Sequence, residues 1–242
     1  MIELLITSGC SFADGVGKWP TQLATELGVP LSNSGLLSQG NGLISRKIIY
    51  QVTRALETIP AENLLVGIMW SGPDRHDFYM PSAKMGTTNE PVDIRTRIGE
   101  DTNNCWVILN HHWDSEYAKY YYGMFHDGIA SLIYTYEHIL RVQWFLKLHN
   151  VKYFMTTFKE TVFPPKKSID THSDIKDLYN QIDFDQFLPI AGQYEWAEQT
   201  GILFDAGDPF HPTVEHNVKF TNEVVLPFLE NKKYLGNKIL NT

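Results

Sequence analysis

Two short segments at opposite ends of the chain hold the residue types that nucleophilic acyl chemistry needs. Ser11 lies in the small-residue turn 9–15, directly after the apolar run 2–7. Asp208 and His211 lie three residues apart, in a segment whose prolines stiffen the backbone. A serine hydroxyl becomes a good nucleophile only beside a base, and a histidine oriented by a carboxylate can be that base. We therefore expect Ser11 as nucleophile, His211 as base and Asp208 as orienting acid.

The periodicity of apolar residues predicts the elements that must position these groups. Strands and helices alternate along the chain, which favours right-handed crossovers and an α/β fold of three α/β/α layers. The sheet is expected to be flavodoxin-like, mostly parallel and five-stranded. Chemistry in such sheets lies beyond the carboxyl ends of the strands, where the first and last strands would deliver the three groups. Strands are predicted at 2–7, 63–70, 151–157 and 202–204, with a very short one after residue 30, and helices at 19–28, 43–58, 117–149, 173–181, 193–200 and 213–230.

The stretch 72–117 lacks a regular period and is rich in Gly, Pro, Thr and Asn. Within it, a short hairpin is expected at 92–98 and 104–109. Connections of this length are often lids or binding loops. With no internal repeat and no linker, the chain is predicted to be one domain, 1–242, in which 72–117 is an insertion and a candidate lid or binding loop.

The amino-acid composition disfavours nucleic acids and membranes as partners of this protein. The 242 residues carry a net charge of −8 and are 43% hydrophobic, which is typical of a globular protein and disfavours nucleic acid as the main partner. No apolar stretch reaches the roughly 20 residues that span a bilayer. Two cysteines indicate no disulfide framework, and the first residues lack the basic region of a secretory signal. The sequence predicts a cytoplasmic protein without membrane contact, and it predicts no oligomeric state.

Four separated segments of this chain resemble, in the same order, the sequence blocks of the SGNH (GDSL-type) hydrolase superfamily. The first resembles the block of the nucleophile, the second the block of an oxyanion-hole glycine, and the fourth the block of the catalytic Asp and His. The third block normally supplies an asparagine amide to the oxyanion, and this chain lacks that asparagine. The four segments are 9–12, 33–41, 64–74 and 208–213.

The resemblance implies a serine esterase that cleaves carboxylic esters of short acyl groups through an acyl-enzyme, without a dissociable cofactor. It also implies an oxyanion hole built from the N–H groups of Ser11 and Gly40, with Gly35 as the alternative glycine. Ser71 would replace the missing asparagine, and Gly72 is the alternative there. Loss of one oxyanion donor typically lowers the rate about 10²–10³-fold, so this difference predicts a slow enzyme or a donor placed elsewhere.

Aromatic and basic residues in and beside the insertion are candidates for substrate binding. Exposed rings stack on sugars, so the expected substrate is a small-molecule or carbohydrate ester, with O-acetylated carbohydrate as one class. The same rings could instead be core residues. The candidate substrate-binding residues are Trp70, Arg75, His112 and Trp113.

Several alternatives stay open at this level. The lack of the third-block asparagine is compatible with a catalytically silent module that binds glycan or protein, and the same triad could transfer an acyl group to an alcohol. Ser11 could be a helix N-cap instead of a nucleophile. Cys10 is a rival nucleophile, although a lone cysteine is most often a small buried hydrophobe. His111, His112 and Asp114 lack a further ligand at matching spacing, so no metal is expected.

Overall fold

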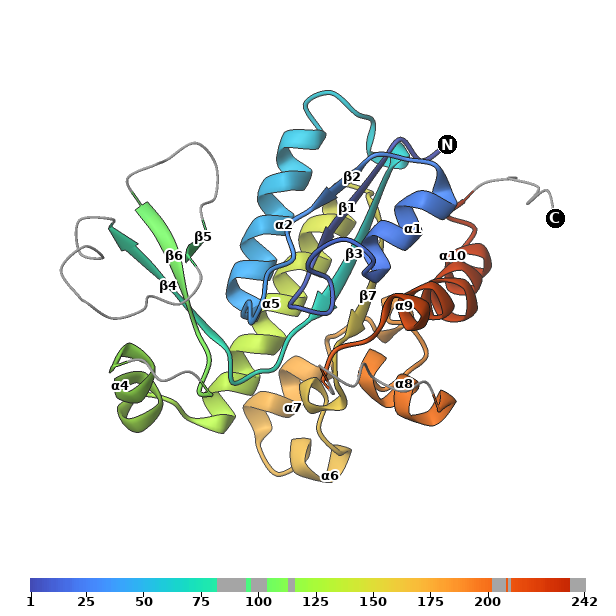
Figure 1. Ribbon diagram of the computed structural model, residues 1–242. Helices are drawn as coiled ribbons and strands as arrows, with labels where there is room; N and C mark the ends of the chain where they lie inside the picture. Colours follow the sequence, from blue (N-terminus) through green and yellow to red (C-terminus); the bar gives the residue numbers. More distant parts are fainter. Residues whose placement is uncertain (82–94, 97–103, 113–115, 202–207, 209, 236–242) are drawn as a thin grey trace.

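The computed structural model describes residues 1–81, 95–96, 104–112, 116–201, 208 and 210–235. The chain is an α/β protein whose four-stranded parallel sheet has the order β2-β1-β3-β7 (Figure 1). The predicted strands at 2–7, 63–70 and 151–157 and the short one after residue 30 are confirmed. The predicted fifth strand, 202–204, lies outside the described residues. The four strands are β1 (Leu4–Ser8), β2 (Leu31–Asn33), β3 (Leu64–Trp70) and β7 (Lys152–Thr157).

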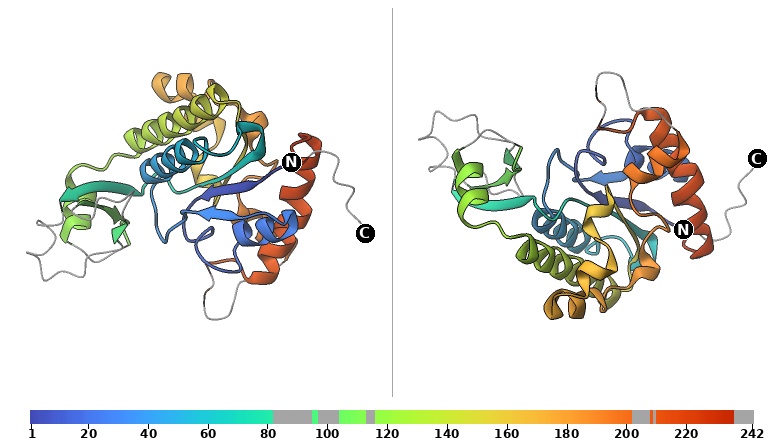
Figure 2. Two further views of the ribbon diagram at one scale, coloured as in Figure 1. Left: turned by 90° about the horizontal axis from the view of Figure 1, so that it is seen from above. Right: turned by 90° about the horizontal axis from the view of Figure 1, so that it is seen from below.

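Helices cover both faces of this sheet, so the main body has three layers (Figure 2). One face carries α2 (Asn41–Ala55), α5 (Gly128–Leu148) and α7 (Ser173–Tyr179). The other carries α1 (Trp19–Leu27), α9 (Val214–Phe220) and α10 (Leu226–Asn231), with the π-helical turn η4 (Thr221–Val225) joining the last two. The remaining helical segments are η1 (Ala61–Asn63), η2 (Glu160–Val162), α6 (Lys166–Ile169), η3 (Phe184–Gln186) and α8 (Gln193–Thr200).

The central strand β3 divides the hydrophobic core into two halves. All seven of its residues are buried, as expected for a strand covered on both sides. Val66 and Ile68 belong to the half beneath α2 and α5, whereas Leu65 and Met69 belong to the half beneath α1 and α10. Because strand side chains alternate in direction, this burial fixes the register of β3 and the position of its carboxyl end.

A second, three-stranded antiparallel sheet is built from the residues of the predicted insertion. Its strands are β4 (His76–Pro81), β5 (Arg95–Thr96) and β6 (Asn104–Leu109), in the order β4-β6-β5. The pairing of β5 with β6 confirms the predicted hairpin, and β4 was not predicted. This sheet projects to one side of the main body, beside α4 (Glu116–Met124) (Figure 1). Val107 and Leu109 of β6 pack against tyrosines of α4.

The long helix predicted at 117–149 is two helices, α4 and α5. The break comes just before Gly128, where the side chain of Asp127 accepts hydrogen bonds of 2.9 Å from the N–H groups of Ile129 and Ala130 and caps α5. Of the helices in the described part of the chain, none has the length and apolar character to cross a membrane.

Candidate active site

The turn after β1 holds Ser11 at the carboxyl end of the parallel sheet. The N–H of Ala13 donates to the carbonyl of Cys10 (2.9 Å), which closes the turn around Ser11. Gly9 lets this turn lie against β3, because a Cβ there would come within 2.9 Å of the Ala13 Cβ and 3.0 Å of the Met69 Cβ. The turn therefore presents Ser11 from a tightly packed backbone.

The structure brings Ser11, His211 and Asp208 into one chain of hydrogen bonds. His211 Nε2 lies 2.8 Å from Ser11 Oγ, although the two residues are 200 positions apart in the sequence. His211 Nδ1 lies 2.6 Å from Asp208 Oδ2. This order of hydroxyl, imidazole and carboxylate is the geometry in which an imidazole accepts a serine proton while a carboxylate fixes its tautomer.

Asp208 is suited to remain ionised. Burial acts to raise its pKa, but the hydrogen bond from the Phe210 N–H (3.2 Å) and the interactions with His211 outweigh that effect and hold the pKa below its ordinary value. Its side chain is 46% exposed, so water also reaches the carboxylate. A charged acceptor therefore faces His211 at neutral pH.

Asn217, which is fully buried in α9, anchors the segment of His211 to the rest of the fold. Its Oδ1 accepts the N–H of Trp19 (3.0 Å) and the side-chain amide of Gln193 (3.1 Å). Its Nδ2 donates to the carbonyls of Pro212 (3.3 Å) and Thr213 (2.7 Å). One side chain thus ties the start of α9 to the starts of α1 and α8.

Ser11 and His211 open into a cavity of about 760 Å³. Its wall comes from the turn after β1, the β2–α2 loop, the segments after β3, β6 and β7, α8 and the His211 segment. Its lining residues are Ser11, Phe12, Leu37, Ser38, Asp74, Arg75, Asn110, His112, Phe158, Lys159, Thr161, Tyr194, Phe210 and His211.

The geometry does not offer Gly40 as an oxyanion donor. Its N–H donates to the buried carboxylate of Asp77 (3.1 Å), which also accepts the N–H of Leu43 (2.9 Å) and so satisfies the amino end of α2. Burial raises the pKa of Asp77 to about 6. A Cβ on residue 40 would lie 2.7 Å from Asp77 Oδ2, so this close approach accounts for the glycine.

Three further predicted donors, Gly35, Ser71 and Gly72, do not line the cavity. Gly35 donates its N–H to Asn33 Oδ1 (3.0 Å). The Ser71 N–H donates to Asn41 Oδ1 (2.8 Å), and the Ser71 hydroxyl accepts from Arg75 (2.7 Å). Buried polar groups require such partners, and here the partners lie within the protein.

Ser38 takes the place in the cavity wall that Gly40 was expected to fill. Its backbone is in the left-handed region, with φ of 58°, which is uncommon for a residue with a side chain. The neighbouring Gln39 side chain donates to Ser8 Oγ and to the Gly9 carbonyl, both at 3.1 Å, and accepts from Lys47 (2.8 Å). Gln39 therefore holds Ser38 against the turn that contains Ser11.

Asn110, directly after β6, brings a side-chain amide to the cavity. It is only 7% exposed and lines the same cavity as Ser11. Its Nδ2 donates to Ser38 Oγ (3.2 Å), and its Oδ1 accepts the N–H of His112 (3.1 Å). These two bonds fix the amide with its NH₂ group toward Ser38. The sequence signal was slight, an asparagine immediately after a predicted strand in a stretch without clear periodicity.

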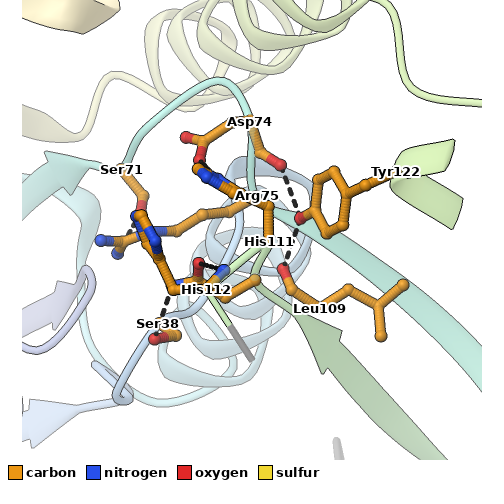
Figure 3. Close-up of polar contacts among 9 residues, drawn as sticks. Ser38, Ser71, Asp74, Arg75, Leu109, His111, His112 and Tyr122 are labelled. Carbon is orange, nitrogen blue, oxygen red and sulfur yellow. Dashed lines mark hydrogen bonds and ion pairs between the residues drawn. The ribbon is translucent and has the colours of Figure 1, made fainter. Parts of the chain in front are cut away.

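Of the predicted substrate-binding residues, Arg75 and His112 line the cavity. Trp70 does not, because it is buried in the core with its indole N–H on the Met155 sulfur. Trp113 lies outside the described residues. Tyr122 of α4 ties the two cavity walls together, since its hydroxyl lies 2.8 Å from the Asp74 carbonyl and 3.1 Å from that of Leu109 (Figure 3).

The rival groups have structural roles. Cys10 is fully buried in the core half beneath α1, so its thiol is not presented to the cavity beside Ser11. Within the described ranges no three His, Cys, Asp or Glu side chains are grouped as metal ligands would be. His111 instead lies 3.4 Å from Asp74, and Asp114 is outside these ranges.

No protein-family model matches this chain, and a comparison with curated proteins finds no match.

Proposed function

We propose that this protein is a serine hydrolase of the SGNH type that cleaves carboxylic esters through a covalent acyl-enzyme. The observation that carries the proposal is the hydrogen-bonded chain from Ser11 Oγ through His211 to Asp208, at 2.8 Å and 2.6 Å, on the wall of a cavity that can hold a small ester. The position of Ser11 at the carboxyl end of a parallel sheet supports the same reading.

In the proposed mechanism, Ser11 Oγ attacks the ester carbonyl as its proton passes to His211 Nε2. Asp208 stabilises the imidazolium through Nδ1. The tetrahedral intermediate collapses, the bond to the alcohol oxygen breaks, and His211 returns the proton to the leaving alcohol. A water molecule then repeats the sequence on the acyl-enzyme and releases the acid.

The oxyanion hole of this proposal consists of the N–H groups of Ser11 and Ser38 and the side-chain amide of Asn110. No described acceptor takes either backbone N–H, and an amide NH₂ has a second hydrogen beyond the one given to Ser38 Oγ. Such donors act where charge develops in the transition state and commonly contribute a large part of the rate.

Fluorophosphonate labelling read by intact mass tests the proposal without knowledge of the substrate. Ser11 Oγ should bond to phosphorus as the P–F bond breaks, fluoride leaves and the proton passes to His211. We expect one adduct on the parent and on Cys10→Ala, and none on Ser11→Ala. An unlabelled parent, beside a control esterase that labels, would contradict the proposal and favour a binding module.

Transfer to an alcohol would use the same acyl-enzyme. Adding an acceptor alcohol to a reaction with an aryl ester distinguishes the two outcomes, because a transferase gives a new ester and a hydrolase gives only the acid.

A further inference from the structure

The cavity beside Ser11 contains two cationic side chains that are held by aromatic rings instead of carboxylates. The Arg75 guanidinium lies 4.9 Å from the centre of the Phe158 ring, and the Lys159 ammonium lies 4.5 Å from that of Tyr194. Among the described residues, neither cation has a carboxylate oxygen within 4.0 Å. Neither charge is therefore held in an ion pair, although Glu195 interacts with Lys159 at longer range.

The two cations belong to one wall of the cavity, because the ring beneath Arg75 belongs to the residue next to Lys159. Arg75 donates one N–H to Ser71 Oγ (2.7 Å), and Figure 3 shows its side chain extending from the loop after β3 to Ser71. A guanidinium has five N–H donors and an ammonium three, so most donors of this wall remain available.

The charges of the surrounding residues make this wall unusual. The chain has 28 acidic and 20 basic residues, yet only one carboxylate lines the cavity among the residues that the structure describes. It belongs to Asp74 and lies 3.4 Å from His111. Partly buried charges are normally paired, since withdrawing them from water is unfavourable. A ring contributes only about 0.5–2 kcal/mol to a cation, so an anionic ligand is the stronger partner.

Aromatic contacts also set the separation between this wall and the base. Phe158 contacts Phe12, and Phe12 contacts His211, each pair with ring centres 5.6 Å apart. Two rings, Phe158 and Phe12, thus lie between the Arg75 guanidinium and the His211 imidazole. Ser11, Arg75 and Lys159 line the same cavity, so a molecule with its carbonyl at Ser11 can extend toward the two cations.

We propose that the substrate is an anionic ester, whose carboxylate or phosphate group binds to Arg75 and Lys159 while its ester carbonyl lies at Ser11. This inference rests on the proposed hydrolase function and adds the substrate class. It distinguishes the substrate from neutral acetylated sugars, which would leave both cations without an anionic partner.

Matched ester pairs test the inference on both sides of the scissile bond. On the alcohol side, 4-acetoxybenzoate and 4-acetoxyphenyl phosphate are compared with methyl 4-acetoxybenzoate. On the acyl side, the p-nitrophenyl monoester of adipate is compared with p-nitrophenyl hexanoate. We expect kcat/KM to favour the anionic ester about tenfold on at least one side, and this preference should weaken as salt screens the charges. The two alcohol-side anions distinguish carboxylate from phosphate.

Substitution of Lys159 assigns the preference to this wall. Lys159→Met keeps the length of the side chain and should reduce the anionic-to-neutral ratio about fivefold, whereas Lys159→Arg should retain it. Lys166→Met, which removes an exposed lysine of α6 outside the cavity, is the matched control. An equal kcat/KM for anionic and neutral esters on both sides, or an unchanged ratio in Lys159→Met, would overturn the inference.

Fluorophosphonate labelling of the same preparation separates the two proposals. Labelled protein without an anionic preference refutes only the substrate class, and unlabelled protein refutes the hydrolase function and this inference with it. Some labelled protein could turn over none of these esters. In that case 4-acetamidobenzoate and its methyl ester are compared as inhibitors of fluorophosphonate labelling, and the inference predicts stronger inhibition by the anion.

Discussion

Replacing Asp208 with asparagine should slow acylation of Ser11 substantially, but by less than the loss of a fully buried triad carboxylate. The substitution keeps an oxygen near His211 and removes the charge that faces Nδ1 at 2.6 Å. Two unit charges at that separation interact by about 2 kcal/mol in water and by about 6 kcal/mol at an effective dielectric constant of about 20.

The partial exposure of Asp208 places the lost interaction energy between the value in water and the value at the lower dielectric constant. Its side chain is 46% exposed, so water screens part of the interaction and about 3 kcal/mol remains. That free energy corresponds to a rate reduction of about 10²-fold, against about 10⁴-fold where the carboxylate of such a triad is buried.

The assay is the second-order rate constant of fluorophosphonate labelling at pH 7.5. Asp127→Asn is the control, because Asp127 caps α5 and asparagine caps a helix equally well. His211→Ala gives the rate without the base. A loss below threefold would refute the role of Asp208, and a loss as large as that of His211→Ala would refute the screening argument.

Three further substitutions test the oxyanion hole, the anchor of the His211 segment and a buried imidazole. Asn110→Leu should lower kcat about 10²–10³-fold with little change in KM, measured with an aryl ester, because the donor acts on the transition state; an equal rise in KM would instead indicate a binding role. Asn217→Ala should lower the free energy of unfolding by about 3 kcal/mol in a urea titration, because it leaves the Trp19 N–H without its acceptor; a change below 1 kcal/mol would show that Asn217 is not the anchor. Burial lowers the pKa of His216 to about 4, so the unfolded chain binds a proton at this residue at a higher pH than the folded protein does. The free energy of unfolding should therefore fall as the pH drops below about 6.5. The parent should therefore lose about 2 kcal/mol more than His216→Leu between pH 7 and pH 5, and exposed His172→Leu should follow the parent.

The sequence predicted the parallel sheet because its determinants are local. Strand β3 is a continuous apolar run, and the helix Trp19–Leu27 has a proline in its first turn and a glycine as its stop. The triad geometry could also be anticipated, because Ser11 and His211 lie in short segments of distinctive composition. Whether these groups carry out acyl chemistry remains a prediction.

The oxyanion donors could not be predicted, because their availability depends on residues distant in the sequence. Gly40 has the residue type of a donor, yet its N–H is taken by Asp77, 37 positions away on a strand that the sequence did not indicate. Asn110 and Ser38 meet only because β6 ends beside the β2–α2 loop. Trp70 was wrongly assigned to the substrate because an aromatic ring after an apolar run is equally suited to a core.

The separation of Ser11 from His211 by 200 positions has a consequence for the protein during its synthesis. During synthesis the turn that holds Ser11 is made well before His211, which follows every described strand of the parallel sheet. If Ser11 is the nucleophile that we propose, a nascent or truncated chain that ends before His211 has no activated hydroxyl with which to attack esters. Under the proposed function, labelling of Ser11 would therefore report completed folding as well as chemistry.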